Sequence, residues 1–383
     1  MLPHSNPTPD ALFVGRVWRP GLGPALVALR GEELVDITSA AHPTMRDLLE
    51  LDDPAAALRA ASGEVIGTLA DLATGSTEAA GDDVLHLLAP CDLQAVKASG
   101  VTFAQSMVER VIEEQAAGDP DKAEAIRARV QAVIGDSLSG IEPGSEKAME
   151  VKRVLLAEGM WSQYLEVGIG PDAEAFTKCQ PMAAVGWGAA VGLHPISKWN
   201  NPEPEIVLAM NSRGTILGAT LGNDVNLRDV EGRSALLLGK AKDNNASCAI
   251  GPFIRLFDEA YTLDDVRKAE LSMTVTGTDG FVLEGASSMS KISRDPASIV
   301  GQTIGRHHQY PDGFLLFLGT LFAPTKDRDA PGQGFTHHPG DVVKISEPGL
   351  GALSNTVRLS TEAPEWTFGT AALMRNLAGR GLL

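Results

Sequence analysis

The chain has 383 residues, of which 44% are hydrophobic and 21% charged, a balance typical of a globular protein with a sizeable core. Its 49 Asp and Glu residues outnumber 32 Lys and Arg residues, which gives a formal net charge of −17. Such a surface repels nucleic acids and anionic membranes, so an anionic small substrate needs a local positive centre such as a metal or a buried lysine.

Targeting and redox features indicate where the protein works. No stretch approaches the roughly 20 apolar residues needed to span a bilayer. Residues 1–10 lack a basic segment followed by an apolar one, so we expect no signal peptide. The three cysteines are scattered and odd in number, which fits a reducing compartment. We therefore expect a cytoplasmic protein with no nucleic-acid partner and no membrane partner.

The first part of the chain predicts a small α/β domain. Residues 11–37 contain short apolar runs separated by glycine and proline, which predicts a small antiparallel sheet. Residues 44–75 are richer in Ala and Leu and predict short helices. Residues 85–93 predict a strand that leads into the rest of the chain. We place the boundary near residue 88, between a small N-terminal domain, 1–88, and a larger domain, 89–383.

The larger domain begins with a helical pattern. Across 103–160 the apolar residues recur at helical spacing, Pro120 suits a first helical turn, and Gly118 and Gly135 suit helix ends. We expect a helical insertion of two or three helices there. From residue 165 onward, short β runs are divided by Gly, Pro, Asn and Asp, which predicts a closed or folded-over β domain. The fold class is therefore α+β and mostly β.

An acidic pair opens one of these β runs. Glu203 and Glu205 are two apart, so on a strand their side chains share one face and repel each other unless a cation lies between them. Taken alone, the pair also fits a solvated strand edge. Asp224 follows nineteen residues after Glu205, and Lys242 follows eighteen residues later. Three carboxylates form an all-oxygen set that suits magnesium, manganese or calcium, and Lys242 offers a base or a cationic contact.

The order of these motifs resembles the fumarylacetoacetate hydrolase superfamily over residues 95–357. The matching elements are Glu-x-Glu, Asn-Asp-Val-x-x-Arg-Asp, Ala-Lys with Ser-Cys close behind, and Gly-Thr. The resemblance implies that Glu203, Glu205 and Asp224 hold the metal. It implies too that Lys242 is the active-site lysine and that Thr320 contacts substrate. The implied catalytic domain, 89–383, is a mixed β-roll, and the implied assembly is a homodimer or homotetramer.

One segment separates the chemistries of this superfamily. Hydrolytic and decarboxylating members carry a segment like Gly-x-Asn-Tyr-x-x-His-x-x-Glu, whose His–Glu pair activates water. Residues 100–110 match it with Phe103 in the place of the tyrosine and Ser106 in the place of the histidine. A neutral serine cannot replace imidazole as a general base. This departure argues against water-activated hydrolysis.

Other features resemble the branch that contains 2-keto-3-deoxy-D-pentonate dehydratases. These are the short spacing between Glu205 and Asp224, the segment 166–178, and the ending 368–383. In that branch a glutamate at the position of Glu174 enters the active site. The implied reaction converts 2-keto-3-deoxy-D-xylonate to 2,5-dioxopentanoate with Mg²⁺, for which Mn²⁺ or Ca²⁺ are possible substitutes.

The dehydratase hypothesis assigns roles to individual residues. Lys242 is the expected base for a C3 proton, provided that burial and a nearby cation lower its pKa, and Glu174 is the expected acid for the departing C4 hydroxyl. The two roles are open to exchange. Phe103, Ser106 and Thr320 are expected to contact the substrate, a small anionic 2-keto acid. The alternatives are an acylpyruvate- or fumarylacetoacetate-type C–C hydrolase, an oxaloacetate-type decarboxylase, and a catalytically idle member.

Overall fold

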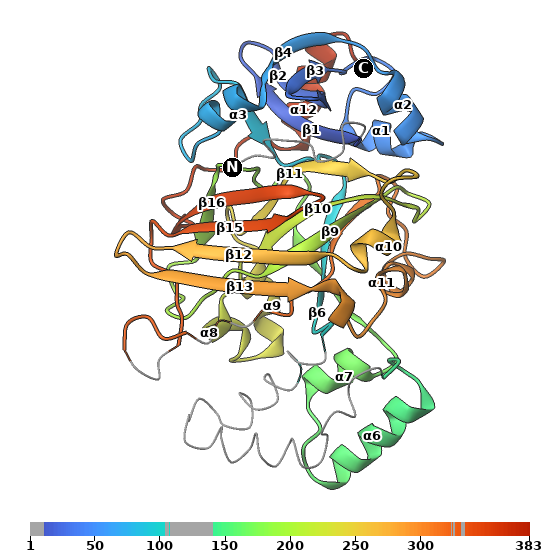
Figure 1. Cartoon of the computed structure of the whole chain (residues 1–383), viewed down its shortest axis with the longest axis vertical. Helices are drawn as coiled ribbons and strands as arrows, with labels where there is room; N and C mark the ends of the chain where they lie inside the picture. Colours follow the sequence, from blue (N-terminus) through green and yellow to red (C-terminus); the bar gives the residue numbers. More distant parts are fainter. Residues whose placement is uncertain (1–10, 104–106, 108–140, 323, 325, 331–333) are drawn as a thin grey trace.

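The computed structural model describes residues 11–103, 107, 141–322, 324, 326–330 and 334–383. Within these residues the chain is mostly β, with one sheet of eleven strands and one of five (Figure 1). This agrees with the predicted fold class. Of the predicted helical insertion, 103–160, most lies outside the described residues, and helix α6 (Glu146–Ala157) is described within it.

The N-terminal strands form the predicted antiparallel sheet. β1 (Phe13–Arg19), β2 (Gly23–Arg30) and β3 (Glu33–Asp36) pair in antiparallel order, which confirms the prediction for 11–37. The short helices predicted over 44–75 are also present, as α1 (Met45–Glu50), α2 (Pro54–Ala60) and α3 (Leu69–Gly75). A fourth strand, β4 (Glu64–Thr68), interrupts them and was not predicted. Its pairing with β3 outweighs the helical tendency of the surrounding Ala and Leu residues.

The larger sheet continues from these strands into the rest of the chain. Its order is β4-β3-β2-β1-β11-β10-β9-β14-β6-β7, and β5 pairs with β1. The strands not yet given are β5 (His86–Leu88), β6 (Ala95–Gly100), β7 (Glu174–Cys179), β9 (Pro204–Met210), β10 (Ile216–Asp224), β11 (Cys248–Leu256) and β14 (Phe314–Phe317). Because β1 pairs with β11, backbone hydrogen bonds join the predicted domains 1–88 and 89–383 in one sheet.

The second sheet packs over the middle of the first. Its order is β13 (Val282–Ser288), β12 (Glu270–Thr276), β15 (Val342–Glu347), β16 (Gly351–Leu359) and β8 (Ala190–Leu193). A large apolar core contains buried side chains from both sheets, including Leu208 and Leu221 from the first and Val275 and Ile345 from the second. The apolar runs predicted as strands after residue 165 are strands in the structure.

Short helices connect the strands, and one further helix follows the last strand. They are α7 (Gln163–Ile169), α8 (Arg228–Glu231), α9 (Leu238–Lys242), α10 (Leu263–Val266), α11 (Pro296–Thr303) and α12 (Thr370–Gly379), with single 3₁₀ turns at Ala235–Leu237 and Met289–Lys291. The C-terminal α12 lies beside the N-terminal strands (Figure 1), where Asn376 Nδ2 donates to the carbonyl oxygen of Leu22 at 2.7 Å. Among the described helices, none combines the length and apolar character needed to cross a bilayer.

A buried ion-pair cluster ties the loop before β15 to the core. Arg328 contacts both carboxylate oxygens of Asp341, at 2.7 and 2.8 Å, and His337 Nδ1 lies 3.0 Å from the same carboxylate. Burial alone would raise the pKa of Asp341, but the contacts with His337 and Arg328 outweigh it and lower the pKa well below its usual value. The cluster is therefore a candidate stabilising element.

Replacing Asp341 with alanine should lower the free energy of unfolding by about 3–5 kcal/mol at pH 7, because Arg328 keeps a buried charge without its main partner. Since the pKa of Asp341 is lowered in the folded state, its contribution is complete above pH ~4 and disappears as the pH falls through the lowered pKa. Urea unfolding at pH 3 and pH 7 measures both effects. The control Asp264→Ala removes an exposed partner of Arg267 and should change stability little.

Candidate active site

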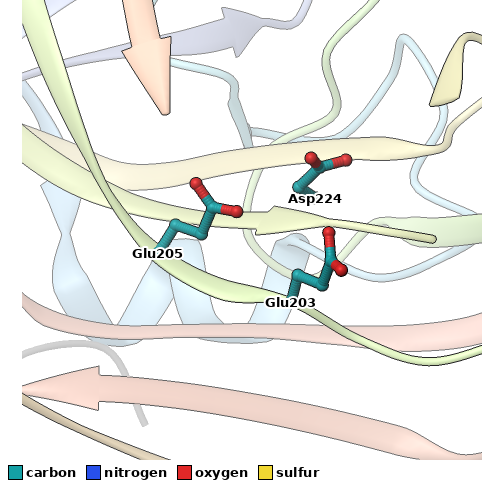
Figure 2. Close-up of side chains that lie close together, drawn as sticks. All are labelled: Glu203, Glu205 and Asp224. Carbon is teal, nitrogen blue, oxygen red and sulfur yellow. The ribbon is translucent and has the colours of Figure 1, made fainter. Parts of the chain in front are cut away.

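Three carboxylates meet at the adjoining ends of β9 and β10. Glu203 directly precedes β9, Glu205 lies within it, and Asp224 ends β10. The backbone N–H of Asp224 donates to the carbonyl oxygen of Glu203 at 3.0 Å, so the two residues are cross-strand neighbours. One oxygen atom from each carboxylate lies within 4.8 Å of the others, and all three side chains are buried. Figure 2 shows the carboxyl groups gathered around one space.

Backbone and amide groups hold these carboxylates in place. Asn226 Nδ2 donates to Glu203 at 3.1 Å, and the backbone N–H of Gly319 donates to Glu205 at 2.6 Å. Gly319 has a φ of 86°, and a Cβ there would lie 2.1 Å from Thr102 Oγ1, so only glycine fits this close approach. The Asn-Asp-Val-Asn motif and the Gly-Thr motif therefore orient the acidic cluster.

Two buried lysines complete the cluster. Lys242, at the end of α9, places Nζ 2.5 Å from Glu203 and 2.9 Å from Asp224. Lys178, in β7, places Nζ 2.9 Å from the other oxygen of Asp224 and donates to the backbone carbonyl of Lys242. The sequence prediction included Lys242 and missed Lys178. The sequence contains one sign of Lys178, its position at the end of the segment 166–178. Lysines are usually exposed, so this position alone did not indicate a buried site residue.

Burial and charge determine how these groups titrate. Burial raises the pKa of Glu205 well above its usual value, and repulsion from Asp224 and Glu203 raises it further. For Asp224, burial favours a raised pKa, but Lys178 and Lys242 outweigh it and lower the pKa. Burial alone would lower the pKa of Lys242, but Asp224 and Glu203 outweigh it and raise the pKa well above its usual value.

The raised pKa of Lys242 bears on one expectation about its role. The sequence analysis required its surroundings to lower the pKa, so that a neutral amine accepts the C3 proton. In the cation-free site Lys242 bridges two carboxylates that favour its charged form, whereas the expectation concerned a site with a bound cation and stays a prediction. A charged ammonium donates protons and does not accept them. The charged form of Lys242 in the cation-free site fits the exchanged assignment, in which Lys242 is the proton donor.

The acidic cluster opens into a small cavity of about 60 Å³. Its lining includes the three carboxylates, Lys242, Glu174 and Thr320. Gly100, opposite Glu174 on β6, makes room for the glutamate, because a Cβ there would lie 2.0 Å from Glu174 Oε2. A neighbouring cavity of about 170 Å³ shares Tyr164, Glu174 and Glu231 with the first. Glu174 thus lies where the two cavities adjoin.

Two predicted substrate contacts are not placed in this lining. Phe103 is fully buried in the main hydrophobic core and is absent from the described residues around the cavity. An aromatic side chain at this position gains more from packing between the sheets than from facing a polar site. Ser106 lies outside the described residues, so its expected role stays a prediction. The cavity lining includes instead Arg228 and Phe176, which the sequence analysis did not select.

The chemistry of the cluster fits a divalent cation. Three carboxylates in one buried space repel one another, and in the cation-free site two ammonium groups offset part of that charge. Oxygen-only ligands at this spacing suit a hard divalent cation, and the described residues place no cysteine or histidine in the cluster. The acidic cluster is therefore able to bind such an ion.

Comparisons with known proteins agree with this site. Residues 181–358 match a family model described as fumarylacetoacetate hydrolase C-terminal, a span that includes the three carboxylates, Lys242 and Thr320. A probable 2-keto-3-deoxyxylonate dehydratase of Haloferax volcanii is 32% identical over 213 residues, 56% of this chain and 68% of that protein. A 2-dehydro-3-deoxy-D-arabinonate dehydratase of Saccharolobus solfataricus is 31% identical over 188 residues, 48% of this chain and 58% of that protein.

Solved structures show the same fold. The apo form of a 2-keto-3-deoxy-D-arabinonate dehydratase matches with a TM-score of 0.64 at 21% identity, covering 91% of this chain and 99% of that one. The same coverage and identity, with a TM-score of 0.63, apply to a structure of that enzyme complexed with magnesium and 2,5-dioxopentanoate. With its motifs, fold and relatives in agreement, the chain belongs to the fumarylacetoacetate hydrolase family.

Proposed function

We propose that the protein is a magnesium-dependent dehydratase that converts 2-keto-3-deoxy-D-xylonate to 2,5-dioxopentanoate. The observation that carries the proposal is the meeting of Glu174 and Lys242 with the acidic cluster around one cavity. The names of the two dehydratase relatives support it, because both act on five-carbon 2-keto-3-deoxy acids. In this chain, elimination of water requires a proton acceptor, a proton donor and a positive centre, and the cavity provides candidates for each.

The acidic cluster supplies the metal ligands of this proposal. Glu203, Glu205 and Asp224 would hold a magnesium ion, whose positive charge would make the C3 protons of a 2-keto acid more acidic. Manganese prefers the same oxygen ligands and is the expected substitute.

The remaining residues move the protons. In the proposed assignment, Glu174 accepts the C3 proton, and the ammonium of Lys242 donates a proton to the departing C4 hydroxyl. The proton balance closes: one proton leaves C3 and one joins the departing hydroxyl as water, which leaves a C3=C4 double bond beside the 2-keto group. A proton then moves from C5 to C3, and the resulting C4=C5 enol tautomerises to the C5 aldehyde of 2,5-dioxopentanoate. The adjoining cavity beside Glu174 provides space for the hydroxylated end of a five-carbon acid.

The direct test is incubation of the protein and Mg²⁺ with 2-keto-3-deoxy-D-xylonate, with an acylpyruvate as the comparison substrate. Proton NMR should show the aldehyde signal of 2,5-dioxopentanoate with the first compound and at most slow cleavage of the second. Efficient cleavage of the acylpyruvate with no change in the sugar acid would replace the dehydratase proposal with the hydrolase alternative. Turnover of neither compound would contradict both.

Replacing Glu174 with glutamine should lower the rate of dehydration by about 10²–10⁴-fold, the usual contribution of one acid–base group. Gly100→Ala should also lower the rate of dehydration, because the added Cβ would displace the Glu174 carboxylate. Neither change touches a proposed metal ligand, so Mn²⁺ affinity should stay close to that of the wild type. The matched control is Glu166→Gln, which removes a carboxylate bound to Lys152 and Trp161 outside the cavity lining. An equal loss of activity in this control would show that the effect is not specific to Glu174.

A further inference from the structure

Lys178 is a buried cation that contacts the acidic cluster and has no role in the proposed reaction. Its side chain is fully buried, with 0% exposed. Its Nζ lies 2.9 Å from Asp224 Oδ1 and contacts the backbone carbonyl oxygens of Val225, at 3.4 Å, and Lys242. All three contacted atoms belong to the segments that carry Asp224 and Lys242. Lys178 therefore lies directly behind the acidic cluster and contacts its third carboxylate.

The two lysines occupy different oxygens of Asp224. Lys242 contacts Oδ2 and also Glu203, and its side chain lines the cavity. Lys178 contacts Oδ1 and is absent from the described cavity lining. Asp224 Oδ2 thus contacts a lysine that lines the cavity, and a cation bound to Oδ2 would compete with Lys242 for this oxygen. Oδ1 contacts a lysine whose side chain is fully buried and whose Nζ also contacts two backbone carbonyl oxygens.

We propose that Lys178 restricts Asp224 to one-oxygen coordination and thereby makes the site select Mg²⁺ or Mn²⁺ over Ca²⁺. The inference rests on the cation site of the proposed function. Calcium takes six to eight oxygen ligands and often uses both oxygens of a carboxylate, whereas magnesium requires six ligands in a compact octahedron. An ammonium fixed on Oδ1 removes one ligand atom that calcium would use. It removes nothing that a six-coordinate ion needs, because Glu203 and Glu205 remain.

The ratio of two affinities separates this role from a structural one. Removing the charge of Lys178 has two effects on cation affinity. It strengthens the attraction of Asp224 for every divalent cation, and it weakens the binding of every cation because the Asp224 side chain is held less firmly. Both effects act on Mg²⁺ and Ca²⁺ in the same direction and largely cancel in the ratio. Freeing Oδ1 acts on calcium alone. The preference for Mg²⁺ over Ca²⁺ therefore reports on the proposed restriction.

The experiment is competition of Mg²⁺ and Ca²⁺ against Mn²⁺, with bound Mn²⁺ followed by electron paramagnetic resonance in the full-length protein. In Lys178→Met the preference for Mg²⁺ over Ca²⁺ should fall by about tenfold, which corresponds to about 1.4 kcal/mol, because Ca²⁺ alone gains a ligand atom. The control is Lys97→Met, on the neighbouring strand β6 and paired with Thr177, whose ratio should equal that of the wild type. An unchanged ratio in a folded Lys178→Met protein would overturn the inference.

Wild-type protein provides a second test if Lys178→Met does not fold. A crystal structure with Mn²⁺, located by its anomalous signal, should show Asp224 bound through one oxygen with Lys178 Nζ still at the other. Two-oxygen coordination by Asp224, or departure of Lys178, would overturn the inference and leave the metal site intact. If the wild type bound none of the three cations, the metal site of the proposed function would fail, and the inference with it.

Discussion

Replacing Glu205 with glutamine should remove divalent-cation binding and turnover while leaving the cation-free protein at least as stable as the wild type. Burial, followed by repulsion from Asp224 and Glu203, raises the pKa of Glu205 well above its usual value. A group whose pKa is raised in the folded state stabilises the protein below its unfolded pKa, and the benefit is lost as the pH rises through the folded value. At pH 8 a neutral glutamine avoids that loss, and its amide oxygen still accepts from the backbone N–H of Gly319.

The loss of cation affinity should be large. Two unit charges 4 Å apart interact by about 4 kcal/mol at an effective dielectric constant of 20, which corresponds to nearly a thousandfold in affinity. We therefore expect the Kd for Mn²⁺ to rise by roughly 10³-fold in Glu205→Gln. Isothermal titration calorimetry measures this affinity, and urea unfolding in EDTA measures the stability. A variant that keeps tight Mn²⁺ binding would exclude Glu205 as a ligand.

The other two ligands provide a matched contrast. Glu203→Gln and Asp224→Asn should weaken cation binding in the same way. Each also takes a carboxylate from Lys242, and Asp224→Asn takes one from Lys178 too, so both should destabilise the cation-free protein. Treatment of the wild type with EDTA should abolish turnover, and Mg²⁺ or Mn²⁺ should restore it.

The parts of the site that follow local periodicity could be predicted from the sequence. Glu203 and Glu205 share a face because side chains alternate along a strand, and the strand begins where the apolar run begins. The order of motifs then placed Asp224 and Lys242 in the same site, although spacing alone does not determine that β9 and β10 pair. Their pairing register, with Glu205 opposite Gly222, brings the carboxylates together.

Features that depend on tertiary packing were beyond the sequence. Lys178 is buried because the segments carrying Asp224 and Lys242 close over β7, and a strand pattern contains no sign of that closure. The direction of the pKa shift of Lys242 depends on which carboxylates surround it, so composition could not give its sign. Phe103 was placed at the substrate by analogy with a tyrosine, but without a hydroxyl group it packs in the core.

Replacing Lys242 with methionine should lower the rate of dehydration by about 10²–10⁴-fold or more. The variant should still exchange the substrate's C3 protons with deuterated water. The ammonium lies 2.5 Å from Glu203 and 2.9 Å from Asp224, and these contacts keep it charged. As the proton donor, it acts when the C4 hydroxyl leaves. Removal of the C3 proton by Glu174 precedes that event, so exchange survives in the variant.

Cation binding and stability provide independent checks on the same variant. Methionine leaves all three carboxylates in place and removes a positive charge that competes for two of them, so Mn²⁺ should bind at least as tightly as in the wild type. Without a cation the variant should be less stable, because Glu203 loses its lysine partner, and added Mn²⁺ should restore stability. The control Lys240→Met removes an exposed lysine from the same helix and should change none of these properties.

The comparison of exchange in two variants decides the direction of proton transfer. If Glu174 is the acceptor, Glu174→Gln loses both exchange and turnover, whereas Lys242→Met loses turnover alone. The opposite pattern, with exchange lost in Lys242→Met and kept in Glu174→Gln, would restore Lys242 as the base. That result would mean that a bound cation neutralises Glu203 and Asp224 enough to reverse the pKa shift found in the cation-free site. Because the two assignments predict opposite exchange patterns at the same residues, one NMR experiment on the two proteins distinguishes them.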